Sequence, residues 1–130
     1  MTERLNIPTG TTVWVRRRTT FIDDRAHQLA NSYYELDVVA GTLIRQENTG
    51  PGGGFARLKE AGYLLAEIRE ELAARMPNSR EPAALDLPAG TPVVELTRTT
   101  FTDTGRPVEV MCAVIAADMS SFDYRFPIPD

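Results

Sequence analysis

Two stretches of the chain alternate apolar and polar residues in nearly the same letters. Residues 5–23 read LNIPTGTTVWVRRRTTFID and residues 85–103 read LDLPAGTPVVELTRTTFTD, with ten of nineteen aligned positions identical and no gap. Alternation of β-branched and polar residues is typical of a half-buried β-strand. The Pro-x-Gly that opens each copy is typical of a turn. Self-similarity over this length indicates an internal repeat.

Each copy continues through a polar turn, which begins at Asp23 or Asp103, into a second strand. The second strands are predicted at 28–34 and 107–115. The chain therefore encodes two β-hairpins built alike. We expect the two copies to superpose within one antiparallel sheet, with these equivalent pairs: Arg18 and Arg98, and Phe21 and Phe101.

The segment between the two copies predicts helices and one uncertain element. GPGGGFARLKEAGY, residues 50–63, predicts a glycine-rich loop, a short helix and a glycine stop. LLAEIREELAARMP, residues 64–77, has propensities that favour a helix, but its alternate apolar positions also fit a strand. Residues 78–88 predict a short helix, capped by Asn78 or Ser79, that leads into the second copy.

The two ends of the chain carry separate expectations. The first copy should also follow a helix, yet Leu5 lies only four residues after Met1. This mismatch suggests that the sequence is a piece of a longer protein, truncated before its first residue. At the other end, a last strand is predicted at about 122–129.

Composition narrows the class of protein. A chain of 130 residues with 42% hydrophobic and 25% charged residues fits one domain that needs neither disulfide nor metal. The net charge of −4 argues against nucleic-acid binding by this chain alone. The single cysteine, Cys112, excludes an internal disulfide and fits the reducing cytoplasm. No stretch resembles a signal peptide or a membrane span.

Candidate chemistry is sparse. The 50–54 loop precedes a helix, so its N–H groups could cradle an anion, although the loop could equally be a flexible connection. It lacks the Lys-Ser/Thr of a P-loop, which argues against nucleotide binding. Cys112 and His27 could form a nucleophile and base, but no third residue orients them. No catalytic residue, metal site or cofactor is therefore predicted.

The second copy carries a family resemblance. LDLPAGTPVVELTRTTFTDTGRPVEV, residues 85–110, and the later Asp118 resemble the UTRA domain of GntR-type bacterial transcription regulators of the HutC subfamily. The resemblance covers essentially the whole chain, 1–130. It implies an α+β fold similar to chorismate lyase, with helices packed on an antiparallel sheet, and it makes 64–77 a strand. It also implies a homodimer, a small-molecule effector, and contact with DNA only through a winged helix-turn-helix that precedes this domain.

The resemblance further implies where the effector binds. Two of the implied positions also have explanations that involve no effector. Glu109 could simply be solvent-exposed, and Arg98 could tie its strand to the turn through Asp103. The implied effector-binding positions are Arg18, Thr20, Ala30, Ser32, Tyr34, Gly53, Gly54, Phe55, Arg98, Glu109, Met111 and Ile115.

Several of these positions depart from the pattern of members that sense sugar phosphates. The departures are Thr20 for an arginine, Ala30 for a glutamate, Gly53 for a hydroxyl residue, and Phe55 and Ile115 for tyrosines. A phosphate dianion in a desolvated site needs charge-assisted hydrogen bonds, each worth about 1.5–3 kcal/mol, and most of their donors are missing. We therefore expect a mainly apolar effector, oriented by Arg18 and Glu109.

Three classes of function follow from the sequence. The first is a metabolite sensor that passes a change in dimer geometry to attached DNA-binding domains. The second is a small-molecule enzyme on the chorismate lyase fold, which is disfavoured because no catalytic constellation can be assembled. The third is a dimerisation module that binds no ligand.

Overall fold

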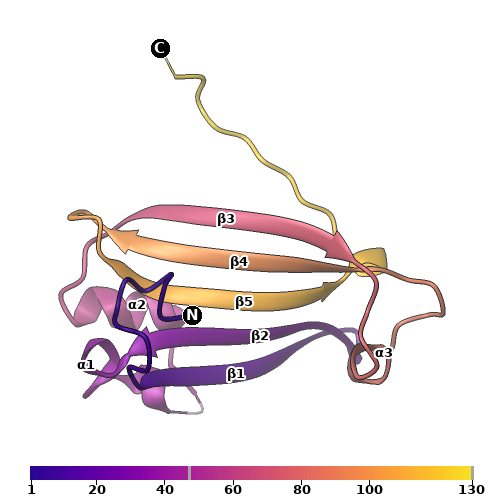
Figure 1. The fold of residues 1–130 in the computed structure, drawn as a ribbon, viewed down its shortest axis with the longest axis horizontal. Helices are drawn as coiled ribbons and strands as arrows, with labels where there is room; N and C mark the ends of the chain where they lie inside the picture. Colours follow the sequence, from indigo (N-terminus) through magenta and orange to yellow (C-terminus); the bar gives the residue numbers. More distant parts are fainter. Residues whose placement is uncertain (47, 130) are drawn as a thin grey trace.

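A single five-stranded antiparallel sheet organises the chain, in the order β1-β2-β5-β4-β3 (Figure 1). The computed structural model describes residues 1–46 and 48–129. The strands are β1 Val13–Ile22, β2 Arg25–Glu35, β3 Leu65–Arg75, β4 Val93–Thr102 and β5 Pro107–Ala116. The helices are α1 Leu36–Val39, η1 Leu43–Arg45, α2 Gly53–Glu60, α3 Glu81–Ala84 and η2 Ala117–Met119. The predicted fold class is confirmed.

The two copies of the repeat form equivalent hairpins, as predicted. The β1–β2 register shifts between Thr20 and Phe21, and the β4–β5 register shifts at the corresponding step between Thr100 and Phe101. A shift of this kind marks a β-bulge, which increases the local twist of the strand. The two hairpins meet where β2 pairs antiparallel with β5, so the repeat builds the two halves of one sheet.

The equivalence extends into the residues that precede each hairpin. The amides of Leu5 and Leu85 each donate to the carbonyl four residues back, at 3.2 and 2.8 Å. The next residue in each copy has a positive φ, 56° at Asn6 and 50° at Asp86. Asn and Asp tolerate this left-handed conformation better than other side chains. The first copy thus has a turn-long counterpart of the helix that precedes the second.

The sheet has two different faces. One face, called the α2 face, carries Arg18, Ser32, Arg98 and Met111 and is contacted by α2 near Tyr34. The opposite face, called the α3 face, is contacted by α3 through Glu81 and Arg75, and by the segment that precedes β1 through Arg4 and Glu71. At one end of the sheet the helices bury a cluster of Tyr34, Val38, Val39, Ile44, Leu58 and Val108. Under α3 lies a second cluster of Ala26, Leu85 and Val93.

The structure confirms the strand that the resemblance implies at residues 64–77, but it does not confirm the strand predicted at 122–129. The first segment is a strand, because β3 pairs with β4 along its whole length, from Leu65 with Thr102 to Arg75 with Val93. Pairing with a neighbour overrides helix propensity here. The predicted strand at 122–129 is wrong: those residues have no strand assignment, and the chain leaves the sheet after η2 (Figure 1). Prolines in this segment also remove backbone donors.

An ion-pair network fixes α3 to the end of β3. Glu81, which is 6% exposed, accepts two bonds from the Arg75 guanidinium at 2.7 and 2.8 Å. It also accepts the backbone N–H of Asn78 at 2.9 Å. The Asn78 side chain in turn accepts the amides of Arg80 and Glu81 at 2.9 and 3.1 Å, although the N-cap residue of α3 is Arg80 rather than the predicted Asn78 or Ser79.

Glu81→Gln is expected to lower the free energy of unfolding by about 1–2 kcal/mol at neutral pH. Hydrogen bonds from Arg75 hold the pKa of Glu81 below its usual 4.5 in the folded state. A depressed folded-state pKa means that this stabilisation is present above about pH 4.5 and is lost as the pH falls through the folded pKa. Urea unfolding at pH 7 and pH 3 checks this. An equal loss at both pH values would contradict it.

Candidate functional site

A cavity of about 220 Å³ opens on the α2 face, between the strands and the start of α2. Strand residues form its floor and walls, and the glycine-rich loop closes one side. It is somewhat smaller than the usual range for ligand sites, about 300–1,000 Å³. Its lining residues are Arg16, Arg18, Tyr34, Gly52, Gly54, Phe55, Arg98 and Glu109.

Three arginines reach the cavity from the two repeat hairpins. Arg16 and Arg18 are two residues apart on β1, so strand alternation places both on one face. Arg18 donates to the Ser32 hydroxyl at 2.9 Å and to the Met111 sulfur at 3.3 Å. Arg98, its repeat equivalent, donates to the same sulfur at 3.5 Å. The two arginines of the repeat therefore converge on one residue of β5.

The cations at this site are incompletely neutralised. Burial, and then the charge of Arg16, lower the pKa of Arg18. Arg98 lies 3.9 Å from the Glu70 carboxylate and 5.8 Å from the centre of the Phe55 ring. Its Nε is buried and has no hydrogen-bond partner among the described residues. An anion in the cavity would supply the missing acceptor.

A buried tyrosine and a buried carboxylate also line the cavity. The Tyr34 hydroxyl donates to Glu109 Oε2 at 2.5 Å, and the two residues are 1% and 4% exposed. Burial, and then the charge of Glu109, raise the pKa of Tyr34, which therefore remains protonated as the donor. Glu109 is thus a cavity residue, and its solvent-exposed alternative does not hold.

Glycines let α2 approach this pair closely. A Cβ on Gly54 would lie 3.3 Å from the Tyr34 hydroxyl and 3.6 Å from Glu109 Oε2. Gly52 has a φ of +84°, and a Cβ there would lie 2.7 Å from the Cβ of Ala56. The first N–H groups of any α-helix lack intrahelical acceptors and favour negative charge. The loop therefore sets the positive end of α2 at the rim of a cationic cavity.

Comparisons with known proteins agree with this architecture. The chain is 38% identical over 129 residues to an uncharacterized HTH-type transcriptional regulator of Streptomyces coelicolor. The aligned region covers 97% of this chain but only 48% of that regulator. The sequence model of the UTRA domain matches residues 1–120. The chain belongs to the UTRA family.

Solved structures show the same fold. A putative GntR-family transcriptional regulator superposes with a TM-score of 0.85 and 28% identity, covering 98% of this UTRA domain and 53% of that chain. The C-terminal domain of the histidine utilization repressor of Pseudomonas syringae superposes with a TM-score of 0.80 and 20% identity, covering 98% and 87%. This UTRA domain therefore has the fold that is found in GntR-family transcription regulators.

The structure distributes the twelve sequence-predicted effector positions into three groups. Those that line the cavity are Arg18, Tyr34, Gly54, Phe55, Arg98 and Glu109. Ser32 and Met111 lie behind it, in contact with Arg18. The others lie away from its lining: Ala30 and Ile115 in a buried cluster with Leu96, Gly53 at the first residue of α2, and Thr20 exposed on β1.

Two lining residues were absent from the sequence prediction. Arg16 could have been found, because it stands two residues before Arg18 on the same strand and must share its face. Gly52 carries no comparable signal, since only the folded loop shows which of several neighbouring glycines turns toward the cavity. The suggestion that Arg98 ties its strand to the turn through Asp103 also needs correction, because the ion-pair partner of Arg98 is Glu70 on β3.

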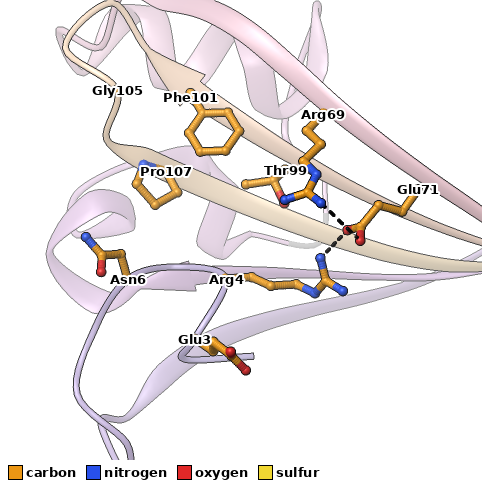
Figure 2. Close-up of a pocket in the computed structure, with 9 residues that line it drawn as sticks. All are labelled: Glu3, Arg4, Asn6, Arg69, Glu71, Thr99, Phe101, Gly105 and Pro107. Atoms are coloured by element: carbon orange, nitrogen blue, oxygen red, sulfur yellow. Dashed lines mark hydrogen bonds and ion pairs between the residues drawn. The ribbon is translucent and has the colours of Figure 1, made fainter.

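A larger hollow of about 540 Å³ lies on the α3 face, between the N-terminal segment and the sheet (Figure 2). Arg4 from that segment and Arg69 from β3 both pair with Glu71, the latter at 3.7 Å. Thr99 and Phe101 form its floor. Because its charged groups already satisfy one another, this hollow offers less to a charged ligand than the smaller cavity.

The structure separates the residues of the other candidate chemistries. Cys112 pairs with Asn31 on β2, four residues along the strand from His27, whose Nε2 lies 2.8 Å from the Ser120 hydroxyl. Burial raises the pKa of the Cys112 thiol, which opposes a nucleophilic role. Within residues 1–46 and 48–129, no side chains gather as a metal site, and no helix has the length and apolarity to cross a bilayer.

Proposed function

We propose that this UTRA domain is the metabolite sensor of a HutC-type transcriptional repressor. In this proposal it acts in the cytoplasm as a homodimer, attached to a winged helix-turn-helix that contacts DNA. The observation that carries the proposal is the cavity between the repeat hairpins and α2, lined by incompletely neutralised arginines. The longer HTH-type relative and the fold of the histidine utilization repressor support it.

The effector that suits this cavity is small and mainly apolar, with one acidic group. Arg18 and Arg98 supply donors for a carboxylate, and the Phe55 ring supplies an apolar wall. Glu109 lies in the same cavity and repels a second negative charge. The hydroxyls of Tyr34 and Ser32 are already engaged with Glu109 and Arg18, so they add little for a phosphate dianion.

Binding at this position would join separate parts of the domain. A ligand held by Arg18 and Arg98 contacts both hairpins, and a ligand against Gly54 also contacts α2. Such a ligand favours whichever arrangement of α2 on the sheet binds it more tightly, and it shifts the population accordingly. The attached DNA-binding domains respond to the same shift in population, and this coupling between the two sites is the regulatory signal.

Thermal-shift measurements on the full chain test the proposed effector class. The panel pairs apolar monocarboxylates with their neutral amides and adds hexosamine phosphates. We expect saturable stabilisation by at least one monocarboxylate and a much smaller effect of its amide, because the amide lacks the charge that the arginines need. Stabilisation by hexosamine phosphates alone would show that the effector class is wrong and leave the sensor function intact.

Catalysis on the chorismate lyase fold is the competing function. The relatives reported above are transcription regulators, which favours a sensor. Incubation with aromatic ethers, followed by chromatography, checks the alternative. We expect no turnover above the uncatalysed rate, and enzyme-dependent product formation would reverse the assignment.

A further inference from the structure

One side chain, that of Arg57, connects α2 to the loop that precedes it, residues 49–52, called the cavity loop. Its Nη1 donates to the Thr49 carbonyl at 3.1 Å, and its Nη2 donates to the Pro51 carbonyl at 3.1 Å. Nη2 also donates to the Glu60 carboxylate at 2.8 Å, on the next turn of the helix. The guanidinium is therefore shared between the helix and two carbonyls of the loop.

This contact is enclosed by the protein. The Arg57 side chain is 10% exposed, and Thr49, whose carbonyl it binds, is 6% exposed. Withdrawing a charge from water is costly unless hydrogen bonds replace its hydration. The two loop carbonyls supply those bonds, so a loop that moved away would leave the cation short of acceptors. The contact therefore restrains the loop more strongly than an exposed ion pair would.

The sequence of the cavity loop is adapted to this contact. Gly50 has a φ of +81°, and a Cβ there would lie 2.8 Å from Arg57 Nη1. Alanine at this position would therefore push the guanidinium away from the loop carbonyls. Glycine also has the greatest backbone freedom, so a loop that contains Gly50 and Gly52 would sample many conformations without a restraint. The Arg57 side chain provides that restraint.

The bond to Pro51 also fixes the orientation of one peptide group. The described residues contain no cis peptide bond, and in a trans peptide the carbonyl and the following N–H point in opposite directions. Because the Pro51 carbonyl points to Arg57, the Gly52 N–H points away from it. Gly52 lines the cavity on the α2 face, and its N–H makes no hydrogen bond within residues 1–46 and 48–129. This donor is therefore available to an anion in the cavity.

The helix that carries Arg57 is anchored in the core. Leu58, the next residue, is fully buried and belongs to the cluster that contains Tyr34. Tyr34 in turn bonds to Glu109 in the cavity. Arg57 thus connects the cavity loop to a part of α2 whose position relative to the cavity is already fixed by packing.

We propose that Arg57 is a positioning residue of the effector site, which holds the cavity loop in place and turns the Gly52 N–H toward the effector. This inference rests on the proposed sensor function and adds a residue to it. Arg57 does not line the cavity, so it acts through the loop. Without it, only a fraction of the molecules has the loop in place, and the apparent affinity falls with that fraction. A bound carboxylate also loses one N–H donor.

Arg57→Ala is expected to weaken binding of the most stabilising monocarboxylate by about tenfold, in calorimetric titrations of the full chain. Arg57→Lys is expected to give a smaller loss. Lysine keeps the charge but replaces a planar fork of donors with a single ammonium group, which does not reproduce both carbonyl bonds. An unchanged affinity in Arg57→Ala would overturn the positioning role.

Two other residues of α2 provide matched controls. Lys59→Ala removes an exposed cation two residues from Arg57, and Glu60→Gln removes the charge of a partner that is 64% exposed while both loop bonds remain. We expect the affinity of each variant to stay within about twofold of wild type. A tenfold loss in Lys59→Ala would assign the effect to the total charge of the helix instead of to the loop contact.

Hydrogen exchange distinguishes positioning from a general loss of structure. In Arg57→Ala we expect the amides of residues 50 and 52–54 to exchange about tenfold faster, while the amides of β4 and β5 keep their wild-type rates. Faster exchange throughout the sheet, together with weaker binding, would show that Arg57 only stabilises the fold. That result would overturn the inference.

Gly50→Ala tests the same contact from the side of the loop. Gly50 lies outside the cavity lining, so its substitution reaches the effector only through the loop. We expect Gly50→Ala to weaken binding, and we expect the combined loss in the double variant with Arg57→Ala to be smaller than the sum of the two single losses. Residues that act through one contact are not additive. Fully additive losses would contradict the contact.

The wild-type titration separates this inference from the proposed function. If the wild-type chain binds a monocarboxylate and Arg57→Ala binds it equally well, the positioning role is wrong and the sensor function stands. If the wild-type chain binds no monocarboxylate, both the proposed effector class and this inference are wrong.

Discussion

Arg18→Ala is expected to weaken binding of the most stabilising monocarboxylate by about ten- to hundredfold. One charge-assisted hydrogen bond contributes about 1.5–3 kcal/mol, which corresponds to this range of affinity. Arg18 is the better choice over Arg16 because its guanidinium is positioned by Ser32 at 2.9 Å and by Met111 at 3.3 Å. Isothermal titration calorimetry on the full chain measures the loss.

Thr20→Ala is the matched control for this prediction. Thr20 is two residues from Arg18 on the same strand, but it is exposed and lies outside the cavity lining. We expect the affinity of the Thr20→Ala variant for the monocarboxylate to stay within about twofold of wild type. Surface substitutions away from a site usually change free energies by about 0.5 kcal/mol or less. Equal losses for both variants would show that binding extends along β1, beyond the cavity.

Leu5→Ala and Leu85→Ala are each expected to lower the free energy of unfolding by about 2–5 kcal/mol. The two leucines are equivalent in the repeat and are 2% and 0% exposed. Each substitution removes a buried side chain and leaves a cavity beneath the turn that leads into a hairpin. Urea denaturation followed by circular dichroism measures both losses.

The comparison between these two variants tests the structural repeat. We expect the two losses to agree within about 1 kcal/mol, and we expect less than about 0.5 kcal/mol for the exposed control Leu36→Ala. The repeat would be contradicted if Leu85→Ala lowered the free energy of unfolding strongly and Leu5→Ala lowered it no more than the exposed control. The turn at Leu5 would then have the same conformation as the turn at Leu85 but contribute little to stability.

The hairpins were predictable because their information is local. Alternation, the Pro-x-Gly turns and the repeated RTTF letters all lie within the segments that they describe. β3 was not predictable from its own residues, since its propensities favour a helix and only pairing with β4 makes it a strand. The predicted strand at 122–129 failed for the converse reason. Its alternation is strand-like, but within the described residues it pairs with no strand of the sheet.

The candidate site was predictable where strand alternation applies. Because successive strand residues point to opposite faces, Glu109 and Met111 must share one face and Cys112 must lie on the other, and the pairing of β5 with β4 agrees. It could not show how far along β1 the cavity extends, which depends on where α2 packs. Arg16 therefore lines the cavity, whereas Thr20, at the same distance from Arg18 in the other direction, does not.

The most direct test of the sensor is a crystal structure of the full chain with the monocarboxylate that stabilises it most. We predict density in the cavity on the α2 face, with the carboxylate within hydrogen-bond distance of Arg18 and the apolar body against Phe55. Density only in the larger hollow beside Arg4 and Glu71, with the cavity on the α2 face unchanged, would contradict the assignment of the effector site.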